Sequence, residues 1–360
     1  MSDGTNPAKA VADFEKVIDK ADVSVASFDT SHESPLQKVR GFLHAYPTAV
    51  PVFVLVASIL MFGVTAGERF FTANNLSLVL QQVTVIGIIA IAQTLVILTA
   101  GIDLSVGAIM VLSSIVIGKL AVQAGVPEPF AILIGGCAGA AMGYVNGTLV
   151  TRLRLPPFIV TLGTLYIFSA LKIWYRNRIH RATDTEAIAP LLIFFGNTLT
   201  FAGAKITYGG ISFILLAVLI WYVLNKTAWG RHVYAVGDDP EAASLSGINT
   251  DRVLRSVYTV AGIICAFGAI VLIGRVGGTV TPLAGETANL DSITAVVIGG
   301  TSLFGGRGSI VGTVIGALIV GVFRNGLSLS GVDVLWQDFT VGILIIVAVA
   351  LDQWIRKVAR

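Results

Sequence analysis

Residues 78–98 read LVLQQVTVIGIIAIAQTLVIL, and this stretch decides the fold class because it contains no charged residue. Its length matches the ~20 residues that an α-helix needs to cross a hydrocarbon layer of ~30 Å. The apolar residues run continuously and do not alternate with polar ones, which favours a membrane helix over a strand of a membrane β-barrel. The stretch therefore predicts a membrane-spanning helix.

Apolar stretches of similar length follow one another from Pro47 onward, separated by short polar breaks. Ten spans are predicted, and because the sixth, eighth and ninth are short, the expected number is eight to ten. We therefore expect an all-α fold, a polytopic membrane helix bundle with about 8–10 transmembrane helices. The predicted spans are residues 47–66, 78–98, 104–123, 130–150, 158–175, 209–224, 256–274, 291–304, 310–324 and 338–353.

The composition of the 360-residue chain supports the same class. Hydrophobic residues make up 55% and charged residues 12%, about half of the ~25% charge that is usual in soluble domains. The lipid bilayer is therefore the expected surrounding, and disordered or collagen-like chains are excluded. The net charge of +3 is small and dispersed, so nucleic acid is not an expected partner. Cys137 and Cys265 lie in apolar runs, as small buried thiols do.

The first 46 residues carry most of the closely spaced charge and are predicted to form a cytoplasmic N-terminal tail, followed by a transmembrane domain at 47–360. With the N-terminus inside, the loops on the cytoplasmic side collect more Lys and Arg than those outside, as the positive-inside rule requires. Both termini are then cytoplasmic. Segment 176–208 becomes a long outer segment, in which residues 190–195 are expected to form a helix lying against the bundle.

A weak internal repeat is present in the pattern. Residues 103–105 (Asp-Leu-Ser) open one span, and the following span carries Gly135, Gly139 and Gly143 before Asn-Gly at 146–147. Residues 290–292 (Leu-Asp-Ser) open another, and the following span carries Asn-Gly at 325–326. On the predicted topology the copies run in opposite directions, which is a common plan of transporters. Chance similarity between two glycine-rich membrane segments is the alternative.

Asp103 and Asp291 stand where membrane spans begin. A carboxylate in a membrane is costly unless it faces protein or water, so each is a candidate functional residue. The structural interpretation is that each caps its helix by accepting hydrogen bonds from the first amides. The sequence leaves both interpretations open.

The pattern contains no constellation for catalysis. The four histidines are scattered without the spacing of metal ligands, and residues 305–309 (GGRGS) lack the lysine and the spacing of a phosphate-binding loop. We therefore expect no enzymatic activity, no metal site and no cofactor in this chain.

The most informative polar stretch is the loop at 225–255. Within it, Pro240 can occupy the first position of a short helix with Asp239 as its cap. Such a helix suits docking into a groove of a soluble partner, and a simple connector is the alternative. Its predicted residues are Glu241, Ala242 and Ala243 in the first turn and Gly247 at its end.

Five stretches carry a family resemblance. They are LTAGIDLSVG at 98–107, GYVNG at 143–147, LPPFIVTLGT at 155–164, the loop at 230–248 and the stretch at 290–309. In their order and spacing they resemble the permease subunits of bacterial ATP-binding-cassette importers for monosaccharides, the ribose, xylose and fructose group, which is related to branched-chain amino-acid permeases. Asn289 departs from the pattern because an acidic residue is expected there.

The resemblance implies an assembly in the bacterial inner membrane. Two copies of the permease would form the translocation path, a separate ATPase subunit holding ATP and Mg²⁺ would bind the cytoplasmic loops, and a periplasmic sugar-binding protein would dock outside. The loop at 225–255 would be the coupling loop. Its coupling residues would be Glu241, Ala242, Ala243 and Gly247.

The expected function is translocation of a monosaccharide, fructose or ribose, by alternating access. A sugar is uncharged, so its path needs hydrogen-bonding groups, although many such groups instead link helices to one another. The alternatives are a branched-chain amino-acid permease and an ion-coupled secondary transporter. The candidates for the path, chosen by polarity and position, are Asn146, Thr161, Asn289, Ser292 and Thr294.

Overall fold

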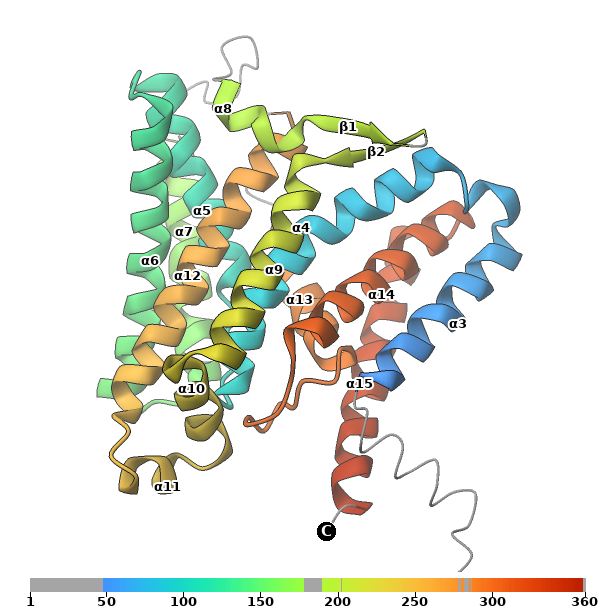
Figure 1. The fold of residues 1–360 in the computed structure, drawn as a ribbon. Coiled ribbons are helices and arrows are strands. Elements are labelled where there is room, and N and C mark those ends of the chain that lie inside the picture. The colour runs from blue at the N-terminus through green and yellow to red at the C-terminus, as the bar shows by residue number, and fades with distance from the viewer. Residues whose placement is uncertain are drawn as a thin grey trace, which may run out of the picture. The chain divides into compact units, whose positions relative to one another are not determined.

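The computed structural model describes residues 48–177, 190–201, 203–277, 280–281, 285 and 287–358 (Figure 1). The predicted tail at 1–46 lies outside the described residues, and so does part of the outer segment 176–208. Everything below concerns the unit that begins at Thr48.

Ten helices of the described part overlap with the ten predicted spans. Seven of them are long and apolar enough to cross a membrane, α5 being counted with its π-helical continuation Lys119–Gln123, whereas α3, α13 and the apolar part of α15 are shorter. The predicted all-α polytopic bundle is therefore confirmed. The ten are α3 (Ala49–Thr65), α4 (Ala73–Leu98), α5 (Val106–Gly118), α6 (Glu128–Arg152), α7 (Pro157–Asn177), α9 (Tyr208–Lys226), α12 (Thr250–Arg275), α13 (Ala288–Ile298), α14 (Ile310–Leu329) and α15 (Val334–Val358).

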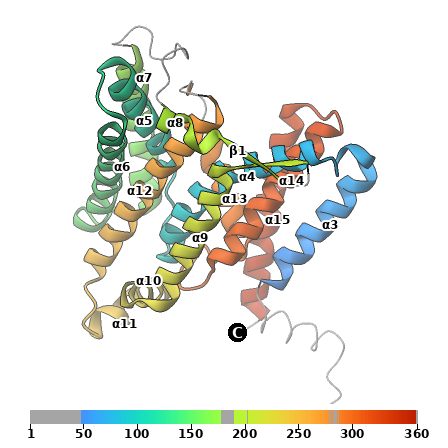
Figure 2. The same ribbon diagram turned by 45° about the horizontal axis from the view of Figure 1, so that its top comes forward.

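The connections between the spans carry the remaining elements. The helix expected at 190–195 appears as α8 (Pro190–Ile193) with the 3₁₀ turn η4 (Phe194–Gly196), and another 3₁₀ turn, η1, covers Gly67–Arg69. An antiparallel hairpin of β1 (Thr198–Phe201) and β2 (Ala204–Thr207) follows. Helices α10 (Ala228–Asp238) and α11 (Pro240–Leu245) lie at the opposite end of the bundle from this hairpin (Figures 1 and 2). We call these the hairpin end and the α11 end.

The hairpin is an element that the sequence interpretation missed. Its register pairs Thr198 with Thr207 and Leu199 with Ile206. Alternating residues on both strands and Gly203 in the turn, with φ of +82°, are a local hairpin signal. The amide of Lys205 donates to Ser77 Oγ at 2.7 Å, which fastens the hairpin to the start of α4.

Helices α4 and α12 form the buried centre of the bundle and pack against each other. Helix α12 also packs against α5 and α6, and α4 packs in the same way against α13 and α14. Helices α5 and α7 are in contact, as are α13 and α15. The centre is antiparallel, because Gln82 of α4 lies near Leu272 of α12, whereas Gly101, just after α4, faces Tyr258. An inverted repeat would give this exchange of packing partners, and the repeat itself stays a prediction.

Glycines at helix contacts replace side chains with close backbone approach. A Cβ atom at Gly139 or Gly143 of α6 would collide with the backbone of α12 at Gly262 or Tyr258. On the other side of the molecule, a Cβ atom at Gly316 of α14 would collide with the carbonyl group of Ala295 of α13. These glycines therefore let the helix backbones approach each other closely.

The predicted eighth span, 291–304, has wrong boundaries. Helix α13 begins at Ala288 and ends at Ile298, where Gly300 adopts φ of +85° and the amide of Thr301 turns back to the carbonyl of Val296 at 3.1 Å. A glycine with positive φ closes a helix in this way because it lacks a Cβ atom. The apolar residues after Ile298 therefore belong to a turn and not to the span.

Candidate functional site

Asp103 lies in the turn between α4 and α5 and is 1% exposed. Its Oδ1 atom accepts hydrogen bonds from the amide of Ser105 at 2.7 Å and from Ser105 Oγ at 2.6 Å. Its Oδ2 atom accepts a longer bond from Asn146 Nδ2 at 3.4 Å. Ser105 is the residue that precedes the first turn of α5, so the carboxylate supports the start of this helix by a local side-chain-to-backbone bond.

The cap predicted at Asp103 is wrong, because Ser105 is the N-cap residue of α5 and, within the described part of the chain, Asp103 binds none of the first amides of this helix. The span was expected to begin at residue 104, whereas α5 begins at Val106, so the amide held is that of Ser105 and not one inside the helix. Gln93 of α4 completes the surroundings: in the orientation of its amide that satisfies both groups, it bonds the backbone N–H and C=O of Asp103 at 3.2 and 3.0 Å. We call Asp103, Ser105, Gln93 and Asn146 the Asp103 cluster.

The five residues predicted to line the substrate path are all buried. Asn146 Nδ2 donates to Ser105 Oγ at 2.8 Å, and Thr161 Oγ1 of α7 donates to the carbonyl of Ile102 at 2.9 Å. These bonds join α6 and α7 to the turn before α5, which is the linking role that polar side chains have in membrane bundles.

The other three path candidates lie on α13. Asn289 Oδ1 accepts from the amide of Gly107 on α5 at 2.7 Å, and the hydroxyls of Ser292 and Thr294 donate to carbonyls of their own helix, each at 2.7 Å. All five candidates therefore make hydrogen bonds within the bundle. Their role in a substrate path stays a prediction.

Asp291 does not cap a helix, and that interpretation is wrong. Because α13 begins at Ala288, Asp291 lies within its first turn and faces α14. Its Oδ1 atom accepts from Nη2 and Nε of Arg324 at 2.7 and 3.2 Å. Arg324 Nη2 also donates to Asp338 Oδ1 of α15 at 3.1 Å. A buried carboxylate is thus paired with a guanidinium group inside the bundle.

A cavity of about 290 Å³ adjoins this ion pair at the hairpin end of the bundle. Five elements contribute to its wall, and charged, amide and hydroxyl groups alternate there with apolar side chains. It is lined by Gln82, Val85, Ile86, Leu272, Arg275, Thr287, Ala288, Asp291, Arg324, Ser328 and Gln337. We call it the Asp291 cavity.

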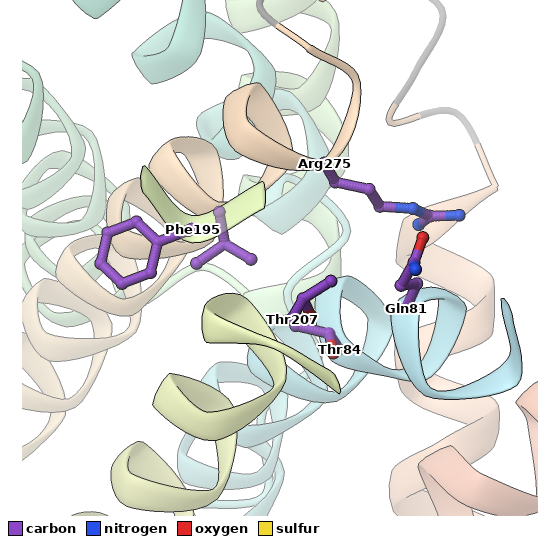
Figure 3. A pocket seen from close by; sticks show the side chains of 6 residues that line it. Gln81, Thr84, Phe195, Thr207 and Arg275 are labelled. Carbon is purple, nitrogen blue, oxygen red and sulfur yellow. The ribbon is translucent and has the colours of Figure 1, made fainter. Parts of the chain in front are cut away.

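A second, much smaller pocket lies where α4, η4, the hairpin and α12 meet (Figure 3). Its volume is about 10 Å³, room for roughly one water molecule. Figure 3 shows the side chain of Arg275 reaching from α12 towards Gln81 of α4 beside this pocket. The pocket is too small for a sugar or an amino acid.

Helix α11 confirms the helix predicted in the loop at 225–255. Asp239 Oδ1 accepts from the amides of Glu241 and Ala242, each at 2.9 Å, and Pro240 occupies the first turn. Glu241 and Ala242 are exposed, whereas Ala243 is buried. Gly247 follows the helix with φ of +85°, which any other residue adopts with strain. The coupling role of these residues is not tested by the geometry and stays a prediction.

Helix α10 connects α11 to both halves of the bundle. A Cβ atom at Gly237 would collide with the carbonyl oxygen of Leu98, at the end of α4, and would crowd the amide of Gly306, in the turn after α13. That amide donates to the Leu98 carbonyl at 3.0 Å. Tyr234 donates its hydroxyl to the carbonyl of Gly308 at 3.0 Å, and burial raises the pKa of this hydroxyl, so it stays a donor. The two turns and α10 therefore meet at one point.

Sequence reasoning missed Arg324 and the exposed residue Leu245 of α11. Arg324 is the last residue of the predicted ninth span, and an arginine in an otherwise apolar helix needs an acidic partner. The sequence therefore contained a signal that could have identified Arg324. Leu245 is 91% exposed at the end of α11, but no spacing in the sequence separates such a residue from the buried leucines around it.

Comparison with known proteins extends these findings. Residues 75–349 match the family described as branched-chain amino acid transport system / permease component. A fructose import permease of Rhizobium meliloti is 55% identical over 360 residues, which is 100% of both chains. A ribose import permease of Bacillus subtilis is 40% identical over 88% of this chain and 93% of its own length. A D-allose transport system permease of Escherichia coli is 36% identical over 85% of this chain and 91% of its own length.

No solved structure matches the chain. The family match covers the helices from α4 to most of α15, and with them the Asp103 cluster, the Asp291 cavity and α11. Three observations agree with one another. The structure is a multi-pass helix bundle, the family model matches most of the chain, and the chain is similar over its full length to an import permease. The chain belongs to the family of permease components of branched-chain amino acid transport systems, in which the related chains named above are sugar import permeases.

Proposed function

We propose that this protein is the permease subunit of an ATP-driven, binding-protein-dependent importer and that it translocates a monosaccharide, fructose or ribose, by alternating access. ATP hydrolysis takes place in a separate ATPase subunit. The full-length similarity to a fructose import permease supports fructose as the first sugar to test, and the ribose permeases support ribose as the second.

The observation that carries this proposal is the construction of the α11 end. Helix α11 is capped by Asp239, presents Glu241 and Ala242 to solvent and ends in the 91% exposed Leu245. An exposed leucine beside polar residues suits a hydrophobic groove on a soluble partner. Through α10 the helix is in direct contact with the turns after α4 and α13. A force applied to α11 therefore acts on both halves of the bundle.

The proposal includes an orientation in the bacterial inner membrane. The loops at the α11 end carry Arg152, Arg154, Lys226, Arg231 and Arg307, and the positive-inside rule assigns such an end to the cytoplasm. The ATPase subunit then binds at α11, and both termini are cytoplasmic. The periplasmic sugar-binding protein docks at the hairpin end, and a second copy of the permease completes the translocation path.

Reconstitution into liposomes with the ATPase subunit and the binding protein tests this function. Radiolabelled fructose or ribose should accumulate only when ATP is enclosed on the α11 side. Uptake driven by an ion gradient without ATP would support a secondary transporter instead. Uptake of leucine or isoleucine that added sugar does not inhibit would support an amino-acid permease.

Variants of α11 test the coupling role separately. Leu245→Asp, Glu241→Arg and Gly247→Trp should abolish most uptake and reduce co-purification of the ATPase. Nothing lies within 4 Å of a Cβ atom at Gly247, so a tryptophan there would contact the partner and not the bundle. Its only cost within the chain is backbone strain of about 1 kcal/mol. Gly247→Ala carries that strain alone and is the matched control. Normal uptake and co-purification in all three variants would remove the coupling role.

A further inference from the structure

We propose that the Asp291 cavity is a binding station for the sugar inside each single permease chain, on the side from which the sugar enters. This inference rests on the proposed function, because it names the place where that substrate is held. It also differs from the sequence-based prediction, since Asp291 alone of the residues singled out there contributes to the wall of the cavity.

The position of the cavity suits a station on a transport route. Its wall combines the middle of α4, the end of α12, the first turns of α13 and α15 and the last turns of α14. Inverted-repeat transporters bind their substrates where the halves meet, and α4 and α12 are the helices at which the two halves of this bundle meet. The volume of about 290 Å³ is at the lower limit of small-molecule pockets, roughly 300–1,000 Å³, as a small ligand requires.

The wall contains a polar atom that has no partner. Gln82 Oε1 is buried and receives no hydrogen bond within the described part of the chain. A buried acceptor without a donor is unfavourable, and a rotation of the Gln82 side chain that turns this oxygen into the cavity would let a ligand hydroxyl group satisfy it. Arg275, Ser328 and Gln337 add donors to the same wall, and Asp291 adds an acceptor. The site therefore offers both kinds of hydrogen-bonding group, as a polyhydroxylated ligand needs.

The charges around the cavity balance only when Asp338 is included. Two arginines, Arg275 and Arg324, and one carboxylate, Asp291, line the wall, and Arg324 is also paired with Asp338, which does not line it. The wall therefore offers charged hydrogen-bonding groups that a neutral ligand can use. Between these groups, Val85, Ile86 and Leu272 form an apolar surface that suits the C–H groups of a sugar ring.

Cysteine protection tests the site without depending on transport. Ser328 and Ser330, two residues further along the chain, are both exposed, but only Ser328 lines the cavity. Ser328→Cys and Ser330→Cys are made separately in the full chain with Cys137→Ser, because Cys137 is the exposed native thiol and Cys265 is buried. The importer is then alkylated in membranes with fructose, ribose or leucine at millimolar concentration, or with no addition.

The proposal predicts that fructose or ribose slows alkylation of Ser328→Cys at least about threefold, as mass action requires for an occupied site. Leucine should not slow it, and no addition should affect Ser330→Cys. In the Ser328→Cys background, Gln82→Leu should raise the sugar concentration for half-protection by about fivefold or more, through the loss of one hydrogen bond. The thermal midpoint of the unliganded protein should not fall, because the variant removes an unpartnered buried acceptor. Absence of protection, or equal protection at residues 328 and 330, would overturn the proposal.

Uptake measurements separate this inference from the proposed function. If the wild-type importer accumulates sugar with ATP but Ser328→Cys is not protected, the station is wrong and the function stands. If no sugar is accumulated but Ser328→Cys is protected, the station stands and the ATP-driven import is wrong. A bulky side chain gives an independent check: Ser328→Phe should lower sugar uptake at least about tenfold by filling the cavity, whereas Ser330→Phe should leave it near the wild-type rate.

Discussion

Asp103 and Asp291 each stand near the start of a helix, α5 and α13, yet their surroundings differ. Asp103 is held by neutral donors, Ser105 and Asn146, in a fully packed cluster towards the α11 end. Asp291 is held by the Arg324 guanidinium group and borders a cavity towards the hairpin end. In this structure one carboxylate is therefore enclosed by protein, whereas the other lies beside open space.

The difference shows two ways of keeping a carboxylate in a membrane bundle. Short hydrogen bonds from neutral groups can stabilise it when it also supports the start of a helix. A guanidinium partner balances the charge but is itself charged, and here Arg324 reaches the partly exposed Asp338 as well. The first arrangement is compact and closed, whereas the second lies beside a polar cavity.

The largest expected effect comes from removing the cation of the Asp291 site. Arg324→Met leaves the Asp291 side chain, which is 4% exposed, without its partner and should lower the free energy of unfolding by about 3–5 kcal/mol. Thermal unfolding in lipid nanodiscs measures this. The double variant Arg324→Met with Asp291→Asn removes the stranded charge and should recover more than half of the loss. Equal losses in the single and the double variant would show that the ion pair is not what matters.

A smaller loss is expected at the Asp103 cluster. Asp103→Leu leaves the Ser105 amide and hydroxyl without their acceptor, at a cost of about 2–3 kcal/mol. Asp103→Asn keeps one oxygen as an acceptor and should lose less than half as much. If the two variants were equally destabilised, charge and not hydrogen bonding would hold the cluster, and the contrast with Asp291 would disappear.

The smallest effect is expected at Asp338. Its side chain is 49% exposed, so its pair with Arg324 is largely solvated and Asp338→Asn should cost at most about 1 kcal/mol. The same unfolding experiment measures it, and added salt should reduce the difference from wild type. A loss as large as that of Arg324→Met would mean that Asp338 is the main partner of the arginine.

Hydropathy is sufficient to predict the helices but not their partners. The ten apolar runs can be located because each must satisfy its backbone within itself in lipid, and α11 can be located because Asp239 and Pro240 form a local start signal. The pairing of Asp291 with Arg324 depends on how α13 and α14 face each other, which no local pattern encodes. The same holds for Gln93 and Asp103. The hairpin was missed although the alternation around Gly203 indicated it.

The path candidates show the same limit from the other side. Asn146, Thr161 and Asn289 are predicted from their polarity near membrane spans, and each makes a hydrogen bond to another segment of the bundle. A polar residue that links two segments and one that contacts substrate share the same sequence signal. The cavity is defined instead by Gln82, Arg275 and Arg324 together, which lie on three helices far apart in the sequence.

The most direct test of the account is the uptake of labelled fructose and ribose by liposomes that contain this permease, its ATPase subunit and its binding protein. The account predicts accumulation of one of these sugars that requires enclosed ATP, stops when Leu245 is replaced by Asp, and persists in Gly247→Ala. Accumulation of sugar without ATP would contradict the account. So would ATP-driven uptake of a branched-chain amino acid by liposomes that accumulate neither sugar.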